Sequence, residues 1–145
     1  MGVLDRVRTM WEHFAHQADI GIRGIGATMD EAFAQAGLAL MAVIGSPDKV
    51  CPTQQTAIAC QADDPEQLFV DWINALIFEV AANHGFFSRF AVTIRDGKLT
   101  ATGFGEPIDP ERHETAVEPK AATYLMLEVR QRPDGNWIAQ CVVDV

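Results

Sequence analysis

The chain has 145 residues, of which 48% are apolar and 21% are charged, and its net charge is −9 because 20 Asp and Glu outnumber 11 Lys and Arg. This length is typical of a single domain, and the apolar content excludes an intrinsically disordered chain. An acidic chain is a poor match for a nucleic-acid backbone, because such binding depends on cationic neutralisation of phosphates. We therefore expect no direct binding of nucleic acid, and a basic protein or a cation as partner.

The cysteines and the N-terminal segment bear on the compartment. Cys51, Cys60 and Cys141 are an odd number without CxxC spacing, which predicts neither a disulfide framework nor a zinc site. Residues 1–10 lack the apolar core of a signal peptide, and no apolar run approaches the ~20 residues that a membrane span requires. We expect a cytoplasmic protein without membrane contact. Residues 1–10 are an N-terminal lead compatible with disorder, and residues 11–145 form one domain.

The first half of the chain predicts two strands and two helices. A strand is expected near residues 19–25, and the capping-box sequence Thr-Met-Asp-Glu at 28–31 begins a helix that stops at Gly-Ser-Pro, residues 45–47. A short strand is expected near residues 56–60. The second helix starts from Asp64 as N-cap, with Pro65 in the first turn and Gln67 in a box-like position, and ends at Asn-His-Gly, residues 83–85.

The second half is predicted to be mostly β. Strands at 90–94 and 98–104 flank the turn sequence Asp96-Gly97, and a second hairpin joins 121–130 to 137–143. Between them, residues 105–119 form a Pro-rich loop with a helical turn near 110–114. The predicted fold class is α+β with two layers, two helices packed on one mixed or antiparallel sheet.

Two histidines and an aspartate lie within seven residues near the start of the chain. On an extended segment His13 and Asp19 share a face while His16 points to the opposite one, so the three do not form a ready ligand set. Partly buried, hydrogen-bonded histidines are the competing interpretation, with His16 positioning the Asp19 loop. Asp19, at the start of a strand that leads into a Gly-rich turn, is the better functional candidate.

The last hairpin places a second acidic residue in a defined register. If Arg132 opposes Trp137, then Asp144 opposes Leu125 and lies diagonal to Thr123. The side chain of Asp144 would then be held by its neighbours across the hairpin.

The end of the chain offers oxygen ligands. Asp144, the terminal carboxylate of Val145 and a backbone oxygen form an all-oxygen cluster near Lys120, which suits Mg²⁺ or Ca²⁺ rather than zinc. The competing interpretation is a frayed, solvated tail.

Several stretches, taken in order, resemble the archease family. The opening Trp-Glu-His-Phe at 11–14 and His-Gln-Ala-Asp-Ile-Gly at 16–21 resemble the opening of the family, with Gln17 in place of the usual Thr. Further similar stretches are the two helices (28–50 and 68–76), Gly-Glu-Pro-Ile-Asp at 105–109 with His113, Glu-Pro-Lys-Ala-Ala-Thr-Tyr at 118–124, Asp-Gly at 134–135, Trp-Ile-Ala-Gln at 137–140 and the closing Asp-Val at 144–145.

The resemblance implies a role as an accessory protein of an RtcB-type RNA ligase, which joins RNA ends in tRNA splicing or RNA repair. Archeases promote guanylylation of the ligase and its multiple turnover, and are not enzymes themselves. They bind a divalent cation, Ca²⁺ or Mg²⁺. Carried over residue by residue, its ligands are Asp19, Asp144 and Val145.

The family's motif at residues 118–124 adds three residues near the proposed cation. Glu118, Lys120 and Thr123 belong to the Glu-x-Lys-Ala-x-Thr-Tyr stretch, and Lys120 would contact phosphate or neutralise the carboxylates. The chain departs from the family at Leu125, where many archeases have His, and at Ser46, where Asp or Asn is common. Neither departure replaces an aspartate, and both concern residues outside the proposed ligand set.

Two other classes of function stay open. A chaperone-like modulator of nucleic-acid-processing proteins would use the cation only structurally. A stand-alone metal-dependent hydrolase would use the same carboxylates, but the sequence offers no recognisable nucleophile or base for it.

Overall fold

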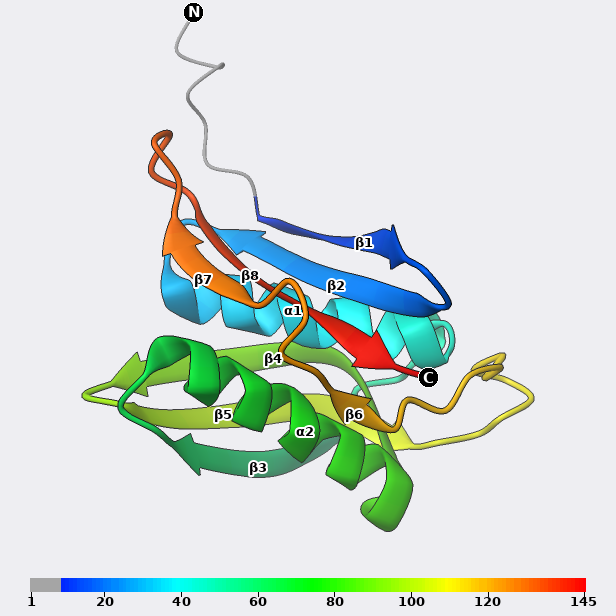
Figure 1. Ribbon diagram of the computed structural model, residues 1–145. Coiled ribbons are helices and arrows are strands. Elements are labelled where there is room, and N and C mark those ends of the chain that lie inside the picture. Colours follow the sequence, from blue (N-terminus) through cyan, green and yellow to red (C-terminus); the bar gives the residue numbers. More distant parts are fainter. Residues whose placement is uncertain (1–8) are drawn as a thin grey trace, which may run out of the picture.

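The computed structural model describes residues 9–145, which form two α-helices and two antiparallel sheets (Figure 1). Residues 1–8, most of the predicted lead, lie outside the described part. No described helix is long and apolar enough to cross a membrane. The elements are β1 (Met10–His16), β2 (Asp19–Gly26), α1 (Met29–Ile44), a short 3₁₀ helix (Pro47–Lys49), β3 (Gln54–Gln61), α2 (Pro65–Asn83), β4 (Gly85–Arg95), β5 (Lys98–Pro107), β6 (Ala121–Ala122), β7 (Glu128–Gln131) and β8 (Trp137–Asp144).

The helix α1 lies between the two sheets. One sheet has the order β1-β2-β8-β6, with β7 also paired to β8, and the other has the order β3-β5-β4. On one side α1 packs against β2 and on the other against β4, while α2 lies across the second sheet and reaches β6 and β7 (Figure 1). A Cβ at Gly24 of β2 would lie 1.9 Å from the Ala32 carbonyl oxygen of α1, so only glycine allows this close approach.

The predicted α+β class with two helices on antiparallel strands is confirmed. The strands differ from the single expected sheet in forming two, because α1 fills the space between β2 and β4. An unpredicted strand, β1, precedes β2. The expected strand over 121–130 is broken into β6 and β7.

Both helices begin at the predicted caps. The Thr28 hydroxyl accepts the Glu31 backbone N–H at 3.1 Å, and the Glu31 carboxylate reaches back to the N–H of residue 27 at 2.9 Å. In α2 the Asp64 carboxylate accepts an N–H two residues on, at 3.1 Å. Gln67 does not complete a box there, since its side chain donates to Asp71 one turn further along, at 2.9 Å.

An aromatic core joins the two helices to the second sheet. Trp72 of α2 is fully buried, and its indole N–H donates to the Phe33 carbonyl oxygen of α1 at 2.9 Å. The rings of Phe69 and Phe90 meet Phe33 and Trp72 edge-on, with centroids 5.1 and 5.4 Å apart. This packing fixes α1, and α1 in turn supports one face of β2 and β8.

Candidate functional site

The hairpin between β1 and β2 brings His16 and Asp19 together. The chain turns back at Gln17 and Ala18, and the strand register pairs His16 directly with Asp19. The expectation that they point to opposite faces is wrong, because it assumed an extended segment where the chain reverses. His13 lies on the other face, where its Nε2 is 2.8 Å from the Ala39 carbonyl oxygen of α1.

The β2–β8 register brings the two acidic residues together from opposite ends of the chain. Ile20 pairs with Val143. Continuing this register by one residue sets Asp19 opposite Asp144. Directly opposed residues of antiparallel strands have Cβ atoms roughly 4.5–5.5 Å apart. Ile20 and Val143 pack on the core, so the alternating side chains of Asp19 and Asp144 face away from α1.

His16, Asp19 and Asp144 therefore form a row across three strands, called the cross-strand row below. Asp19 and His16 are half-buried and Asp144 is exposed. The Nδ1 atom of His16 is buried and has no hydrogen-bond partner. The role of His16 in positioning the Asp19 loop stays a prediction.

The predicted register of the last hairpin is wrong. Trp137 pairs with Gln131 rather than Arg132, and Asp144 pairs with Ala121 rather than Leu125. The shift at Trp137 arises in the turn, where the Arg132 N–H donates to the Asn136 carbonyl oxygen at 2.7 Å. The further shift at Asp144 comes from the irregular segment between β6 and β7, residues 123–127, which adds residues on one side of the hairpin.

The Thr123 side chain builds this irregular segment. Its hydroxyl donates to the Val142 carbonyl oxygen at 2.8 Å and accepts the Leu125 N–H at 3.1 Å. Thr123 thus holds the end of β8 through main-chain contacts.

Lys120 and Val145 fix the end of the chain beside the row. The Lys120 N–H donates to the Asp144 carbonyl oxygen at 2.8 Å, and the half-buried Val145 side chain packs against the core. The frayed-tail interpretation of the chain end is therefore wrong. The Lys120 side chain is exposed, and its ammonium makes no ion pair within residues 9–145.

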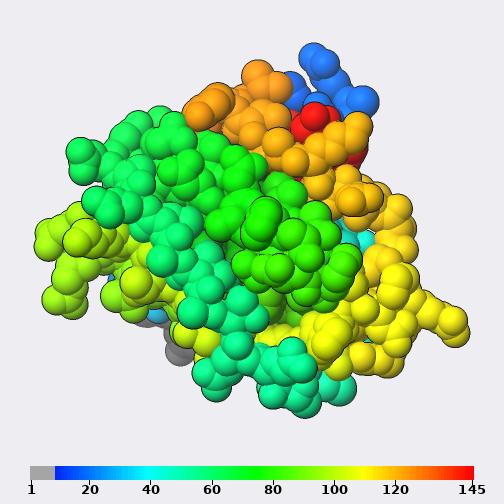
Figure 2. Space-filling model, turned by 90° about the horizontal axis from the view of Figure 1, so that it is seen from below, coloured from blue at the N-terminus to red at the C-terminus, as the bar shows by residue number. Residues whose placement is uncertain are grey.

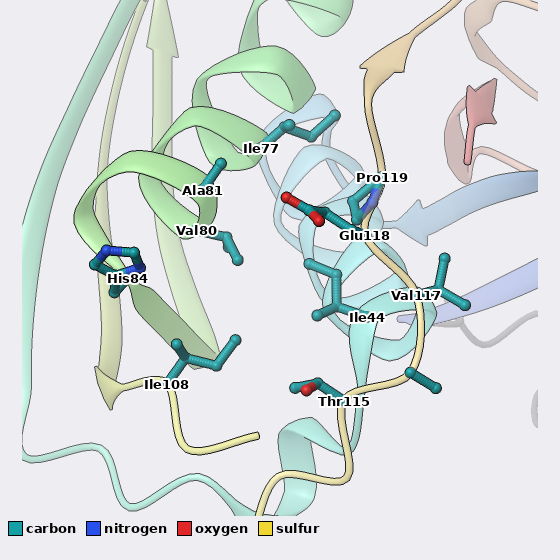
Figure 3. Close-up of a pocket in the computed structure, with 11 residues that line it drawn as sticks. Ile44, Ile77, Val80, Ala81, His84, Ile108, Thr115, Val117, Glu118 and Pro119 are labelled. Carbon is teal, nitrogen blue, oxygen red and sulfur yellow. The ribbon is translucent and has the colours of Figure 1, made fainter. Parts of the chain in front are cut away.

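Glu118 lies at a different place. It lines a pocket of about 370 Å³ between the C-terminal half of α2 and the segment 115–119, where Figure 3 shows its carboxylate directed toward α2. The remaining lining is mostly apolar and includes Ile44, Ile77, Val80 and Ile108.

The cross-strand row offers few protein ligands for a cation. Within residues 9–145 no group of three or more His, Cys, Asp and Glu side chains is arranged to hold a metal ion. Two carboxylates would supply only part of the oxygen ligands of Mg²⁺ or Ca²⁺, which keep waters or take phosphate oxygens at their other positions. The row is thus suited to a cation that a second molecule helps to coordinate.

A second polar cluster, which sequence reasoning did not identify, ties the loop 105–119 to the body. Glu106 accepts the Cys51 N–H at 2.8 Å, the Arg112 guanidinium at 2.7 Å and the His113 Nε2–H at 2.8 Å. These contacts, the Cys51 N–H first, lower the pKa of Glu106 to about 2. His113 is fully buried and its Nδ1 accepts the Asp109 N–H, so the proton is on Nε2. These contacts join the segment around residues 109–113 to β5 and to residue 51.

Comparison with known proteins identifies the family. Residues 11–145 match the Archease protein family (MTH1598/TM1083). The chain belongs to the archease family. The protein archease of Pyrococcus furiosus is 40% identical over 139 residues, covering 93% of this chain and 98% of that protein, and the archease of Thermococcus kodakarensis is 36% identical with the same coverage.

A solved member of the archease family has the same fold. The solution structure of Methanobacterium thermoautotrophicum protein 1598 superposes with a TM-score of 0.79 at 30% identity, covering 93% of this chain and 98% of that one. The motifs at 11–21, 118–124 and 144–145 thus lie in an archease fold that brings the first and last of them together at the cross-strand row.

Proposed function

We propose that this protein is an accessory factor, not an enzyme, that activates an RtcB-type RNA ligase. It promotes guanylylation of the ligase and its multiple turnover, in tRNA splicing or RNA repair. The proposal rests on membership of the archease family. The observation that carries it to particular residues is the pairing of Ile20 with Val143, because continuing this register by one residue sets Asp19 opposite Asp144.

The residues that would hold the cation are Asp19, Asp144 and a main-chain oxygen of Val145. When bound, Ca²⁺ or Mg²⁺ supplies positive charge that orients and neutralises triphosphate oxygens during nucleotidyl transfer. Two carboxylates at the end of a sheet leave room for phosphate oxygens of a second molecule, which is how Mg²⁺ is commonly bound at nucleotide sites.

Neighbouring side chains support a phosphate-bearing ligand at the same place. The Lys120 backbone is hydrogen-bonded to Asp144, and its exposed ammonium is available to contact a phosphate. Thr123 contributes by holding the end of β8.

The charge of the chain is consistent with this role. At a net charge of −9 the protein is attracted to a basic RNA-handling enzyme without competing for its RNA.

The test measures guanylylation of a purified RtcB-type ligase with GTP, with and without this protein. We expect the wild type to raise the rate and Asp19→Asn to abolish the increase while retaining the wild-type circular dichroism spectrum. Asp48→Asn removes the same charge from an exposed residue outside the row and should stimulate like the wild type. Full stimulation by Asp19→Asn would refute the role of the row, and no stimulation by the wild type would refute the proposed function.

A further inference from the structure

Exposed apolar side chains are concentrated on one side of the molecule. Of the six large apolar residues exposed within residues 9–145, four lie where α2 meets the segment 118–126: Phe78, Tyr124, Leu125 and Met126, which are 61%, 64%, 50% and 51% exposed. These four are called the seam patch below. Large apolar side chains exposed on neighbouring segments mark interaction sites more often than single exposed residues do.

Specific hydrogen bonds hold the seam patch in place. The Tyr124 hydroxyl donates to Gln67 of α2 at 3.1 Å, and the Ala122 N–H donates to Asn74 of α2 at 2.9 Å. Phe78 follows Asn74 by four residues and is its neighbour on the helix surface. Figure 2 shows α2 in green with the segment around residues 120–130 in orange along its side. The patch is therefore a fixed surface.

The seam patch adjoins the cross-strand row. The Leu125 carbonyl oxygen accepts the Val142 N–H at 3.0 Å, and the Met126 carbonyl oxygen accepts the Gln140 side chain at 3.0 Å. Val142 lies two residues before Asp144 on the same strand face. Met126 has φ +55°, a conformation that costs a non-glycine residue energy and that clusters at functional sites.

At the other end, the seam patch meets the pocket of Figure 3. Ile77 and Ala81, one residue before and three residues after Phe78, line it together with Pro119. Its volume of about 370 Å³ is enough for one large apolar side chain. The Glu118 carboxylate lies at its rim and can pair with a cation next to such a side chain.

The two segments that carry the seam patch hold more acidic than basic side chains. The helix α2 carries Glu66, Asp71 and Glu79 and has no Lys, Arg or His. The segment 115–127 carries one acidic and one basic side chain, Glu118 and Lys120. A partner that covers this surface needs apolar side chains surrounded by Arg and Lys.

The geometry points to the seam patch and the adjoining pocket as the surface on which the ligase docks. The occupant is a ligase segment with an apolar side chain for the pocket and flanking Arg or Lys for Glu118 and the acidic side chains of α2. This inference rests on the proposed function and adds where the contact is made. Docking here would bring the cross-strand row against the ligase, because the row borders the patch.

The test compares two double variants for binding to a purified RtcB-type ligase by calorimetry. Phe78→Ser with Leu125→Ser truncates two exposed side chains of the patch. Met10→Ser with Trp11→Ser truncates the remaining two exposed apolar residues, on β1, and serves as the matched control. Truncating two interface side chains of this kind should weaken Kd at least about tenfold. The control should bind like the wild type, and thermal melting should show both variants folded.

The outcomes separate this inference from the proposed function. If the wild type binds and stimulates the ligase while the patch variant has an unchanged Kd, the docking surface is refuted and the proposed function stands. If the wild type neither binds nor stimulates, both fail. A wild-type dimer in sedimentation equilibrium that the patch variant abolishes would assign the surface to a second copy of the chain and overturn the inference. A tenfold or larger loss of affinity for the ligase that is confined to the patch variant supports the inferred docking surface.

Discussion

Replacing Asp144 with Asn should have opposite effects on stability with and without a divalent cation. In the metal-free protein the β2–β8 register, continued by one residue beyond Ile20 and Val143, sets the like charges of Asp19 and Asp144 opposite each other, and such a pair destabilises a sheet by about 0.2–1 kcal/mol. Because Asp144 is exposed, the screened value near 0.5 kcal/mol applies. Asp144→Asn should therefore raise the metal-free melting temperature by about 1–2 °C.

With Ca²⁺ present, the wild type should melt at a higher temperature than Asp144→Asn. A ligand at a hundred times its Kd stabilises the folded state by about 2.7 kcal/mol, which corresponds to roughly 5–10 °C for a chain of this size. We expect this rise in the wild type and its loss in Asp144→Asn.

The assay is thermal unfolding followed by circular dichroism, first in EDTA and then across a CaCl₂ titration. Asp48→Asn, which removes one charge from an exposed residue elsewhere, should behave like the wild type in both conditions. A variant that melts below the wild type in EDTA, or a wild type that does not respond to Ca²⁺, would refute the reasoning.

Three further predictions concern the fold. Glu106 has a folded pKa of about 2, below its ordinary 4.5, so its contribution to stability is present above pH 4.5 and is lost as the pH falls toward 2. In urea unfolding, the free energy of unfolding of Glu106→Gln should therefore fall less steeply between pH 4.5 and pH 2 than that of the wild type. An equal dependence on pH in both proteins would count against the cluster. Gln17 has φ +54°, so Gln17→Gly should raise the free energy of unfolding by about 0.5 kcal/mol in the same assay, and a decrease would show that the turn is unstrained. Trp72→Phe removes the hydrogen bond to Phe33 and leaves a void, which should cost about 2–3 kcal/mol, and a loss under 1 kcal/mol would contradict the tight core.

The helices and most strands could be predicted because their determinants are local. The Thr28 hydroxyl and the Glu31 carboxylate each accept a backbone N–H at the start of the first helix, and the Asp64 carboxylate caps the second helix. The turn Asp96-Gly97 joins β4 and β5 as its sequence indicates. Strand β1 was missed because its turn, Gln17-Ala18, has neither the Asn-Gly nor the Asp-Gly sequence typical of tight hairpins.

The candidate site could be predicted in its residues but not in its geometry. Asp19 and Asp144 were candidates from sequence, yet their neighbourhood depends on pairing between strands that are more than a hundred residues apart, which no local pattern encodes. The registers of His16 and of Asp144 were mispredicted for a similar reason. The register of His16 depends on the β1–β2 hairpin, which its sequence does not announce. The register of Asp144 depends on the irregular segment between β6 and β7, where the Thr123 hydroxyl donates to the Val142 carbonyl oxygen.

The most direct test of a cation shared by Asp19 and Asp144 is calorimetric titration of the metal-free protein with Ca²⁺ and with Mg²⁺. The account predicts one site per chain in the wild type, and no measurable binding when both aspartates are replaced by Asn. Binding of equal stoichiometry and affinity in the double variant would contradict it, as would a wild type that binds neither cation.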